Sequence, residues 1–557
     1  MEIKIQSFFI FLLLLSLFMI FSKHSAYPDY YFTVKTGGRW VLLQESIGIS
    51  AMHMQVLKNN KVIMFDRTDF GLSNLSLPDG KCRINDDVVP IDCTAHSILY
   101  DIASNSFLPL TIITDPWCSS GSVDADGTLI QTGGDKKGEK IIRTFSPCDD
   151  CDWVELNSPR LFNRRWYSTS QVLPDGRIVI VGGRRVFTYE FYPKSSFQPD
   201  NVTFPFLAQT RDPQEENNLY PFLHLLPDGN LFIFANNRSI LFDYKRNQVI
   251  KEYPVLRGGS RNFPSTGSSV LLPLRMTGEP KTPEAEVLIC GGAHPGAYIK
   301  AQKENVYLEA SRTCGRLKLT DPDSQWVMEF MPTPRVMNDL ILLPSGDVLI
   351  INGATNGTAG WNDAVNPVLN PVLYLPDAAP SPTERFVVLT ASIIPRMYHS
   401  TAALLPDGRI LVGGSNPHPT YNFTARPYAT ELSLEAYYPP YLDVQHSKLR
   451  PSILTVEAAE KTLSYNEMFA VTFVLNLNRE EFGIIVELIT PPFNTHSFSM
   501  NQRMVVLNVV NVERLSSFGY KVNVIGPTSV NVAPPGYYML FVVHAGIPSH
   551  AVWVRLR

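Results

Sequence analysis

Short apolar runs alternate with turn-forming residues in a unit that recurs along most of the chain. Each unit reads apolar strand, Asp-Gly-type turn, apolar strand and glycine pair, as in LPDGRIVIVGG (Leu173 to Gly183) and LPDGRILVGG (Leu405 to Gly414). An Asp-Gly pair supplies the positive φ angles that a tight hairpin requires, and β-branched residues favour the strand that follows. The pattern therefore predicts a β-hairpin at every copy.

Seven copies of the unit follow one another at intervals of about 50 to 60 residues. A β-helix would repeat at much shorter intervals, and a sandwich would not repeat seven times. A period of this length ending in Gly-Gly is typical of kelch-type propellers, with one four-stranded blade per copy. We therefore predict an all-β chain in which residues 27–443 form a seven-bladed kelch-type β-propeller. The other five copies lie at Asp124 to Gly134, Leu226 to Asn236, Glu284 to Gly292, Leu343 to Gly353 and, in degenerate form, from Leu57.

The pattern changes after Asp443. Residues 444–557 show alternating strands and frequent turn residues, without a further Gly-Gly copy. About a hundred residues of this kind predict an immunoglobulin-like β-sandwich. A second domain is also expected because 557 residues exceed a single ordinary core.

The N-terminus carries the pattern of a secretory signal. Lys4 precedes an apolar run from Phe8 to Phe21, and small residues follow up to Ala26. The pattern predicts a signal peptide over residues 1–26, with an uncleaved signal anchor as the alternative. Cleavage is favoured because five N-x-S/T sequons follow, so we expect a secreted, extracellular glycoprotein, in the cell wall or apoplast if the source is a plant. The sequons are at Asn74, Asn201, Asn237, Asn356 and Asn422.

The formal net charge is −4, which gives no reason to expect a nucleic acid or an anionic membrane as partner. We expect a monomer with no membrane association after signal cleavage.

Seven cysteines in a secreted chain leave one without a partner. Cys118, in DPWCSSGS, has no near neighbour among the others. It is either a buried free thiol or a cysteine with a chemical role. The other six are close to one another in sequence, Cys82 to Cys93, Cys148 to Cys151 and Cys290 to Cys314.

Two of the units carry potential metal ligands just before their hairpins. Tyr167 and His399 each lie eight residues before a turn aspartate, Asp175 and Asp407, and Tyr398 precedes His399. Inner strands line the axis of a propeller, so both segments point to one central region. Taken singly, such a tyrosine is more often a packing residue, and a lone histidine is usually not a ligand. Phenolate and imidazole together suit Cu(II) better than zinc or calcium, and a second histidine would complete the site.

Four segments share their residue patterns with one known family. They are WCSSGSVDADG around Cys118, RRWYSTSQVLPDG around Tyr167, PRMYHSTAALLPDG around Tyr398 and His399, and TPPFNTHSFSM around His496 in the sandwich. They resemble the radical copper oxidases, meaning galactose oxidase and especially the plant-type glyoxal (aldehyde) oxidases, over nearly the whole mature chain. In that family the segments carry, in order, the cross-linking cysteine, the radical tyrosine, the axial tyrosine with a histidine ligand, and the last histidine ligand.

The resemblance implies one copper ion held by Tyr167, Tyr398, His399 and His496, with one position left for water or substrate. It also implies a thioether between Cys118 and Tyr167, which would account for the seventh cysteine and leave six for three disulfides. The cross-link would lower the oxidation potential of the phenol, so that a tyrosyl radical beside Cu(II) acts as a two-electron oxidant. Tyr398 would take the substrate hydroxyl proton, the Tyr167 radical would take the C–H hydrogen, and O₂ would be reduced to H₂O₂.

Two departures from galactose oxidase favour the glyoxal oxidase branch. The stretch GGRRVFTYEF lacks the tryptophan that stacks on the thioether there, so Phe187 or an arginine is expected to cover the site. We also expect no N-terminal carbohydrate-binding domain before the first blade. The predicted substrates are small aldehydes of the glyoxal or methylglyoxal type, oxidised as hydrates to carboxylic acids. The alternatives are a galactose or primary-alcohol oxidase on the same site, and a non-catalytic kelch-type propeller that binds a glycan or protein.

Overall fold

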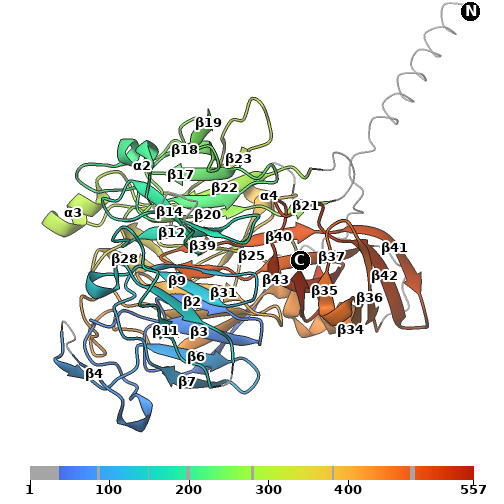
Figure 1. The fold of residues 1–557 in the computed structure, drawn as a ribbon, viewed down its shortest axis with the longest axis horizontal. Helices are drawn as coiled ribbons and strands as arrows, with labels where there is room; N and C mark the ends of the chain where they lie inside the picture. The colour runs from blue at the N-terminus through green and yellow to red at the C-terminus, as the bar shows by residue number, and fades with distance from the viewer. Residues whose placement is uncertain are drawn as a thin grey trace, which may run out of the picture.

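A computed structural model describes residues 37–84, 88–148, 150–195, 201–276, 282–378, 382–476 and 483–557. The predicted signal peptide lies outside these residues. The described chain is built mainly of strands, and its α-helices are short: α2 (Pro205–Thr210), α3 (Ala297–Glu304) and α4 (Pro382–Arg385). The prediction of an all-β protein is confirmed (Figure 1).

Seven antiparallel units of four strands each account for most of the described chain up to Tyr438. The first three units are β2 (His53–Val56), β3 (Lys61–Phe65), β6 (Ser97–Asp101) and β7 (Ser106–Leu110); β8 (Ser120–Val123), β9 (Leu129–Thr132), β10 (Ile142–Phe145) and β11 (Val154–Glu155); and β12 (Ser168–Val172), β13 (Ile178–Gly182), β14 (Thr188–Tyr192) and β15 (Val202–Thr203). The next three units are β16 (Phe222–Leu225), β17 (Leu231–Ala235), β18 (Arg238–Asp243) and β19 (Gln248–Glu252); β20 (Gly267–Leu271), β22 (Glu286–Gly291), β23 (Thr313–Lys318) and β24 (Val327–Phe330); and β25 (Asp339–Leu342), β26 (Val348–Ile351), β29 (Val372–Tyr374) and β30 (Phe386–Val388). The seventh unit contains β31 (Ser400–Leu404), β32 (Ile410–Gly414) and β33 (Leu434–Tyr438) and is completed by β1 (Arg39–Gln44).

Each predicted copy contains the second strand of one of these sheets, in most cases together with the turn before it, and we interpret the sheets as the predicted blades. The last sheet is closed by the N-terminal strand, because β1 pairs with β33 in antiparallel register. The copy at Glu284 to Gly292 differs from the others. Its strand β22 pairs with β20, but the two strands are joined by a longer connection that contains β21 (Leu274–Arg275) instead of a tight turn.

The C-terminal region is a separate pair of sheets (Figure 1, red). The first contains β40 (Arg503–Val506), β37 (Ile484–Thr490), β43 (Gly536–His544), β45 (Val552–Leu556) and β35 (Thr462–Leu463), with β44 (Ile547–Pro548) on β43. The second contains β34 (Ser452–Glu457), β36 (Met468–Val474), β42 (Gly519–Ile525) and β41 (Asn508–Arg514). The two domains are joined through their backbones, because β21 pairs in parallel with β40.

One hairpin of the C-terminal domain belongs spatially to the propeller. Strands β38 (Phe493–Thr495) and β39 (Phe498–Met500) form this hairpin, and β38 adds to the inner strand β2. The hairpin also contacts β8, β12, β16, β20, β25 and β31, so it touches the first strand of each of the seven sheets. It therefore fills the centre around which the sheets are arranged.

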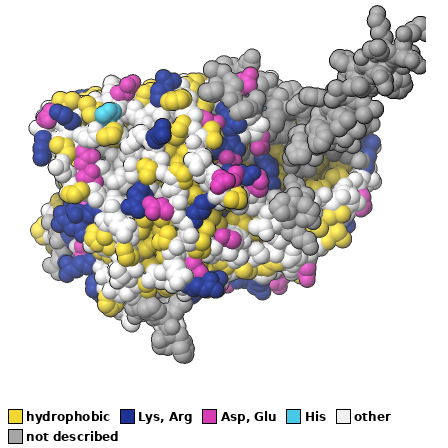
Figure 2. Space-filling view, turned by 90° about the horizontal axis from the view of Figure 1, so that it is seen from above, with side chains coloured by type: hydrophobic (Ala, Val, Ile, Leu, Met, Phe, Trp, Pro, Cys, Tyr) yellow, Lys and Arg dark blue, Asp and Glu magenta, His cyan; other side chains and the backbone are white. Residues whose placement is uncertain are grey.

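On the face seen in Figure 2, basic and acidic side chains of the described residues are interspersed among apolar and neutral ones. None of the described helices combines the length and the apolar character needed to cross a membrane.

Candidate metal centre

Three of the predicted residues occupy one and the same position in their sheets, at the entrance to the inner strand. Ser168 pairs with Gly182 and Ser400 pairs with Gly414, so Tyr167 and His399 each immediately precede the inner strand. Cys118 lies at the corresponding position before β8. All three adopt left-handed backbone angles, with φ of 66°, 65° and 50°. Such angles are unfavourable for side chains other than glycine and cluster at functional sites.

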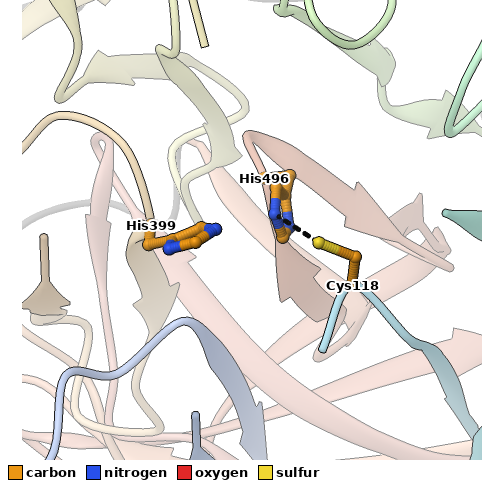
Figure 3. Close-up of side chains that lie close together, drawn as sticks. All are labelled: Cys118, His399 and His496. Atoms are coloured by element: carbon orange, nitrogen blue, oxygen red, sulfur yellow. Dashed lines mark hydrogen bonds between the residues drawn. The ribbon is translucent and has the colours of Figure 1, made fainter. Parts of the chain in front are cut away.

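His496 reaches these residues from the tip of the β38–β39 hairpin. Its own φ is 46°, which turns the chain sharply between the two strands. Thr495 Oγ1 lies 2.7 Å from His496 Nδ1, and this contact orients the ring so that Nε2 faces the centre. Cys118 Sγ lies 3.1 Å from Nε2 (Figure 3).

His399 faces His496 across the centre (Figure 3). The two imidazole centroids are 4.9 Å apart, and potential ligand atoms of Cys118, His399 and His496 lie within 4.8 Å of one another. Both ring nitrogens of His399 are buried and lack a hydrogen-bond partner among the described residues. The nearby backbone N–H of Asn416 donates instead to the carbonyl of Tyr398, at 2.9 Å. Buried polar atoms without partners are rare, and a missing metal ion is one explanation for them.

Both predicted tyrosines border the same space. The rings of Tyr167 and Tyr398 each lie 5.8 Å from that of His496, and Tyr398 stacks on His399 at 3.7 Å. The backbone N–H of Tyr167 donates to the carbonyl of Cys118, at 2.9 Å. The structure therefore brings together all five residues that the sequence singled out, although they come from three separate blades and the C-terminal domain.

Burial determines the charge of these groups in the protein without metal. It raises the pKa of Tyr167 well above its usual value, and the neighbouring Cys118 thiol adds to this rise. Burial likewise raises the pKa values of Tyr398 and Cys118. It lowers the pKa values of His399 and His496 well below the usual value, so both imidazoles are neutral and keep a free nitrogen lone pair. Two neutral imidazoles and two phenols are a nitrogen and oxygen donor set that suits Cu(II).

The cover over Tyr167 comes from a different residue than the sequence suggested. Phe263 stacks on Tyr167 with ring centroids 4.5 Å apart and an interplanar angle of 28°. Phe187 packs instead against the cluster that contains Tyr189. The guanidinium of Arg184 lies 5.2 Å from the ring of Trp166, a ring neighbour of Tyr167, and not over Tyr167 itself.

Tyr220 is a site residue that the sequence analysis missed. It has a φ of 50°, its ring lies 5.1 Å from that of His496 and 5.4 Å from that of Tyr167, and its hydroxyl donates to the Ser119 carbonyl at 3.0 Å. A signal was present in the sequence. Tyr220 lies eight residues before the turn aspartate Asp228, the same offset that identified Tyr167 and His399.

The remaining predicted features are the disulfides and the glycosylation sequons. The structure pairs Cys82 with Cys93, Cys148 with Cys151 and Cys290 with Cys314, and it leaves Cys118 as a buried free thiol. Of the sequon asparagines, three are exposed and two are partly buried. The exposed ones are Asn74, Asn201 and Asn422, and the partly buried ones are Asn237 and Asn356.

Comparison with known proteins finds matches over most of the chain. The family described as "Glyoxal oxidase N-terminus" matches residues 52–441, and the family "Galactose oxidase-like, Early set domain" matches residues 450–556. "Aldehyde oxidase GLOX" of Vitis pseudoreticulata is 44% identical over 524 residues, covering 93% of this chain and 97% of that protein. "Aldehyde oxidase GLOX1" of Arabidopsis thaliana is 43% identical over 525 residues, covering 93% and 84%.

More distant proteins share the fold. Galactose oxidase of Gibberella zeae is 24% identical over 461 residues, covering 79% of this chain and 61% of that protein. A solved structure of a fungal alcohol oxidase in complex with copper superimposes with a TM-score of 0.70 at 18% identity, covering 93% of this chain and 99% of the other. At that identity the match shows the fold alone.

Proposed function

The chain belongs to the glyoxal oxidase family of copper-radical oxidases, and from that premise we propose that it is a secreted oxidase of small aldehydes. An aldehyde hydrate and O₂ would give a carboxylic acid and H₂O₂, as RCH(OH)₂ + O₂ → RCOOH + H₂O₂. Copper would be held by Tyr167, Tyr398, His399 and His496. A thioether between Cys118 and Tyr167 would complete the redox centre.

The observation that carries the copper site is the environment of His399. Its two ring nitrogens are buried, neutral and without hydrogen-bond partners, while His496 presents Nε2 to the same space. Leaving buried polar atoms unpaired costs about 1–3 kcal/mol each. A metal ion bound by these imidazoles would remove that cost, and the two phenols on the same centre favour copper over zinc or calcium.

When bound, copper would supply a one-electron couple and a Lewis acid beside the phenols. The chain's own contribution begins with Tyr167, whose phenoxyl form would take the hydrogen atom from the substrate carbon. The burial that raises the pKa of Tyr167 also favours the neutral phenol that this transfer produces. Cys118, the hydrogen-bonding neighbour of Tyr167, would form the thioether.

Tyr398 is the proposed base for the hydroxyl proton of the aldehyde hydrate. Burial raises its pKa, so its phenolate form would bind a proton strongly once one is offered. Stacking on His399, at 3.7 Å, holds the ring against the same centre that Tyr167 faces. The two tyrosines would thus have separate roles, because Tyr398 would accept the proton and Tyr167 would accept the hydrogen atom.

Sequence identity to the named relatives favours aldehydes over galactose or a primary alcohol as substrates. The relatives named aldehyde oxidases are 43–44% identical, whereas galactose oxidase is 24% identical. Membership of this oxidase family also argues against a non-catalytic binding propeller. Secretion is supported by three disulfides, which persist in oxidising compartments. The monomeric state and glycosylation at the five sequons stay predictions.

Intact mass after copper loading in air and full reduction tests the redox centre. The wild-type chain should be lighter by two hydrogens than its calculated mass, and Cys118→Ser should show no such loss. A wild-type chain that loses no hydrogens would disprove the thioether. A peroxide assay with glyoxal, methylglyoxal, galactose and a primary alcohol then tests the substrate. Higher kcat/KM on galactose or the alcohol would move the protein to the alternative branch.

A further inference from the structure

Three of the seven tryptophans in the sequence form a line of rings that begins at Tyr167. Trp166 lies with its ring centroid 4.8 Å from that of Tyr167, and Trp117 lies 4.8 Å from Trp166. Trp361 then stacks on Trp117 at 5.5 Å, with an interplanar angle of 15°. Two of these tryptophans also adjoin the redox centre in sequence, because Trp117 precedes Cys118 and Trp166 precedes Tyr167.

The line runs from the interior to the surface. Tyr167 is 4% exposed and Trp117 is 6% exposed, Trp166 is partly buried, and Trp361 is the most exposed of the three indoles, at 37%. The other proposed copper ligands are also buried. A protein or a bulky metal complex in solution therefore cannot touch the redox centre, but it can touch the indole of Trp361.

The chemistry of the rings separates this line from the other neighbours of Tyr167. Indole and phenol are among the most easily oxidised side chains, and rings in near contact allow an electron to hop from one to the next. Phe263 also stacks on Tyr167, but a benzene ring is much harder to oxidise. Tyr220 is oxidisable, but it is 2% exposed and ends inside the protein. Among the described ring contacts of Tyr167, Trp166 is the one that leads outward.

The charge beside Trp117 is balanced. The guanidinium of Arg67 lies 3.7 Å from the ring centroid of Trp117, where a lone cation would oppose loss of an electron from the indole. Asp69 is ion-paired with this guanidinium, and its carboxylate offsets the positive charge.

We propose that Trp361 is an electron-exit site through which an external one-electron oxidant converts the reduced centre into its radical form, by way of Trp117 and Trp166. This inference rests on the proposed function. In the step, Tyr167, which bound copper would hold as a phenolate in place of the neutral phenol of the metal-free protein, loses one electron and becomes a neutral phenoxyl, while the copper stays in its oxidised state. The electron passes through the three indoles to the oxidant, which is reduced by one electron. No bond forms or breaks, and no proton moves.

Stopped-flow oxidation of the copper-loaded protein tests the route. The protein is first reduced with ascorbate and freed of it, then mixed with hexacyanoferrate(III), and both the loss of oxidant absorbance and the growth of the radical spectrum are followed. Trp361→Phe should slow radical formation about tenfold or more, which corresponds to at least 1.4 kcal/mol of barrier. Trp361→Tyr should recover most of the rate, because it restores an oxidisable ring. Trp553→Phe, in the C-terminal domain, is the matched control and should react like the wild type.

The internal variant Trp117→Phe provides a second measurement that does not depend on the surface. It should slow radical formation at least as much as Trp361→Phe, with unchanged copper content and an unchanged loss of two hydrogens. Wild-type rates in both variants, or a Trp361→Tyr rate as low as that of Trp361→Phe, would overturn the relay alone. A wild-type protein that forms neither thioether nor radical would overturn the proposed function and the relay together.

Discussion

The entry segments of two blades show how one scaffold presents two different sets of side chains. Before β12 the chain reads Arg165-Trp166-Tyr167, and before β31 it reads Arg396-Met397-Tyr398-His399. The arginines play the same part in both. Arg165 donates to the Gly182 carbonyl and Arg396 to the Gly414 carbonyl, each at 2.6 Å.

The two segments are also anchored alike on their outer sides. Arg165 pairs with Glu190 on β14 at 2.6 Å, and Arg396 pairs with Glu435 on β33 at 2.8 Å. Both segments end in a left-handed residue, Tyr167 or His399, directly before the strand. The backbone of the entrance is therefore set by arginine, glycine and glutamate, and the side chain at the left-handed position is free to vary.

The difference lies in one extra residue. Met397 lengthens the second segment by one position between the arginine and the strand, and it is itself buried. Tyr398 then faces the centre together with His399, whereas Trp166, the residue before Tyr167, joins the line of indoles that leads to the surface. The segment before β31, which is one residue longer, thus presents two residues to the centre, Tyr398 and His399. The segment before β12 presents only Tyr167, and its neighbour Trp166 contacts Trp117 instead.

The largest effect is expected from removing the hydroxyl of Tyr167, in the segment before β12. Tyr167→Phe should lose peroxide formation to the background of the assay and should lose the two-hydrogen mass change, because no phenol remains to be cross-linked or oxidised. The fold should persist, since Phe keeps the stacking on Phe263. Retained aldehyde oxidation in this variant would contradict the assignment of the radical to Tyr167.

The corresponding change in the second entrance should separate the two roles. Tyr398→Phe should reduce kcat/KM by about 10²–10⁴-fold, the usual worth of a positioned base. The loss of two hydrogens should remain, because Cys118 and Tyr167 are untouched. Absence of the cross-link in Tyr398→Phe would show that the two entrances act as one unit.

The structural roles of Arg165 and Arg396 can be compared by measuring the free energy of unfolding of variants that lack each arginine. Arg396→Met leaves the buried Glu435 without its ion pair, which costs about 3–5 kcal/mol of unfolding free energy, whereas in Arg165→Met the buried Glu190 keeps its second ion pair, with Lys194. Chemical denaturation should show a loss in both variants, with the larger loss in Arg396→Met. Arg246→Met is the control, because its ion pair with Asp243 is on an exposed arginine and should be worth about 0–1 kcal/mol. A loss no larger than that of the exposed control in either buried variant would refute a common scaffold.

The blade that begins with β25 differs from these two blades in carrying a buried carboxyl group, which should make its contribution to stability depend on pH. Thr169 and Thr401, two positions after the left-handed residues, donate to carbonyls of the next blade at 2.8 Å, while β25 carries Asp339 at that position. Burial raises the pKa of Asp339 to about 7, which the hydrogen bond from Asn352 only partly offsets.

Because the pKa of Asp339 in the folded protein exceeds that of an unfolded aspartate, the folded state binds this proton more tightly. The contribution to stability is present below about pH 4 and is lost as the pH rises through 7, by at most about 1.4 kcal/mol per pH unit. Asp339→Asn should flatten the dependence of unfolding free energy on pH between 4 and 7. An unchanged slope in this variant would mean that Asp339 does not titrate in that range.

Much of the site could be predicted because the repeats can be aligned on their turns, so that equivalent positions in different blades are identified from the sequence. The constant distance of eight residues from the turn places Tyr167 and His399 at equal heights in their blades, and the same offset finds Tyr220 and Cys118, counted from Asp126. His496 has no such offset. It was found only through family resemblance, since nothing in its local pattern shows that the β38–β39 hairpin enters the propeller.

Local sequence determined the hairpins and the left-handed entrances, because each depends on residues that are close along the chain. Tertiary structure decided the rest. Phe263 rather than Phe187 covers Tyr167, His496 crosses from the other domain, and Trp361 completes the line of indoles that starts at Tyr167. These are contacts between segments far apart in sequence, and their geometry is fixed only when the blades close around the hairpin.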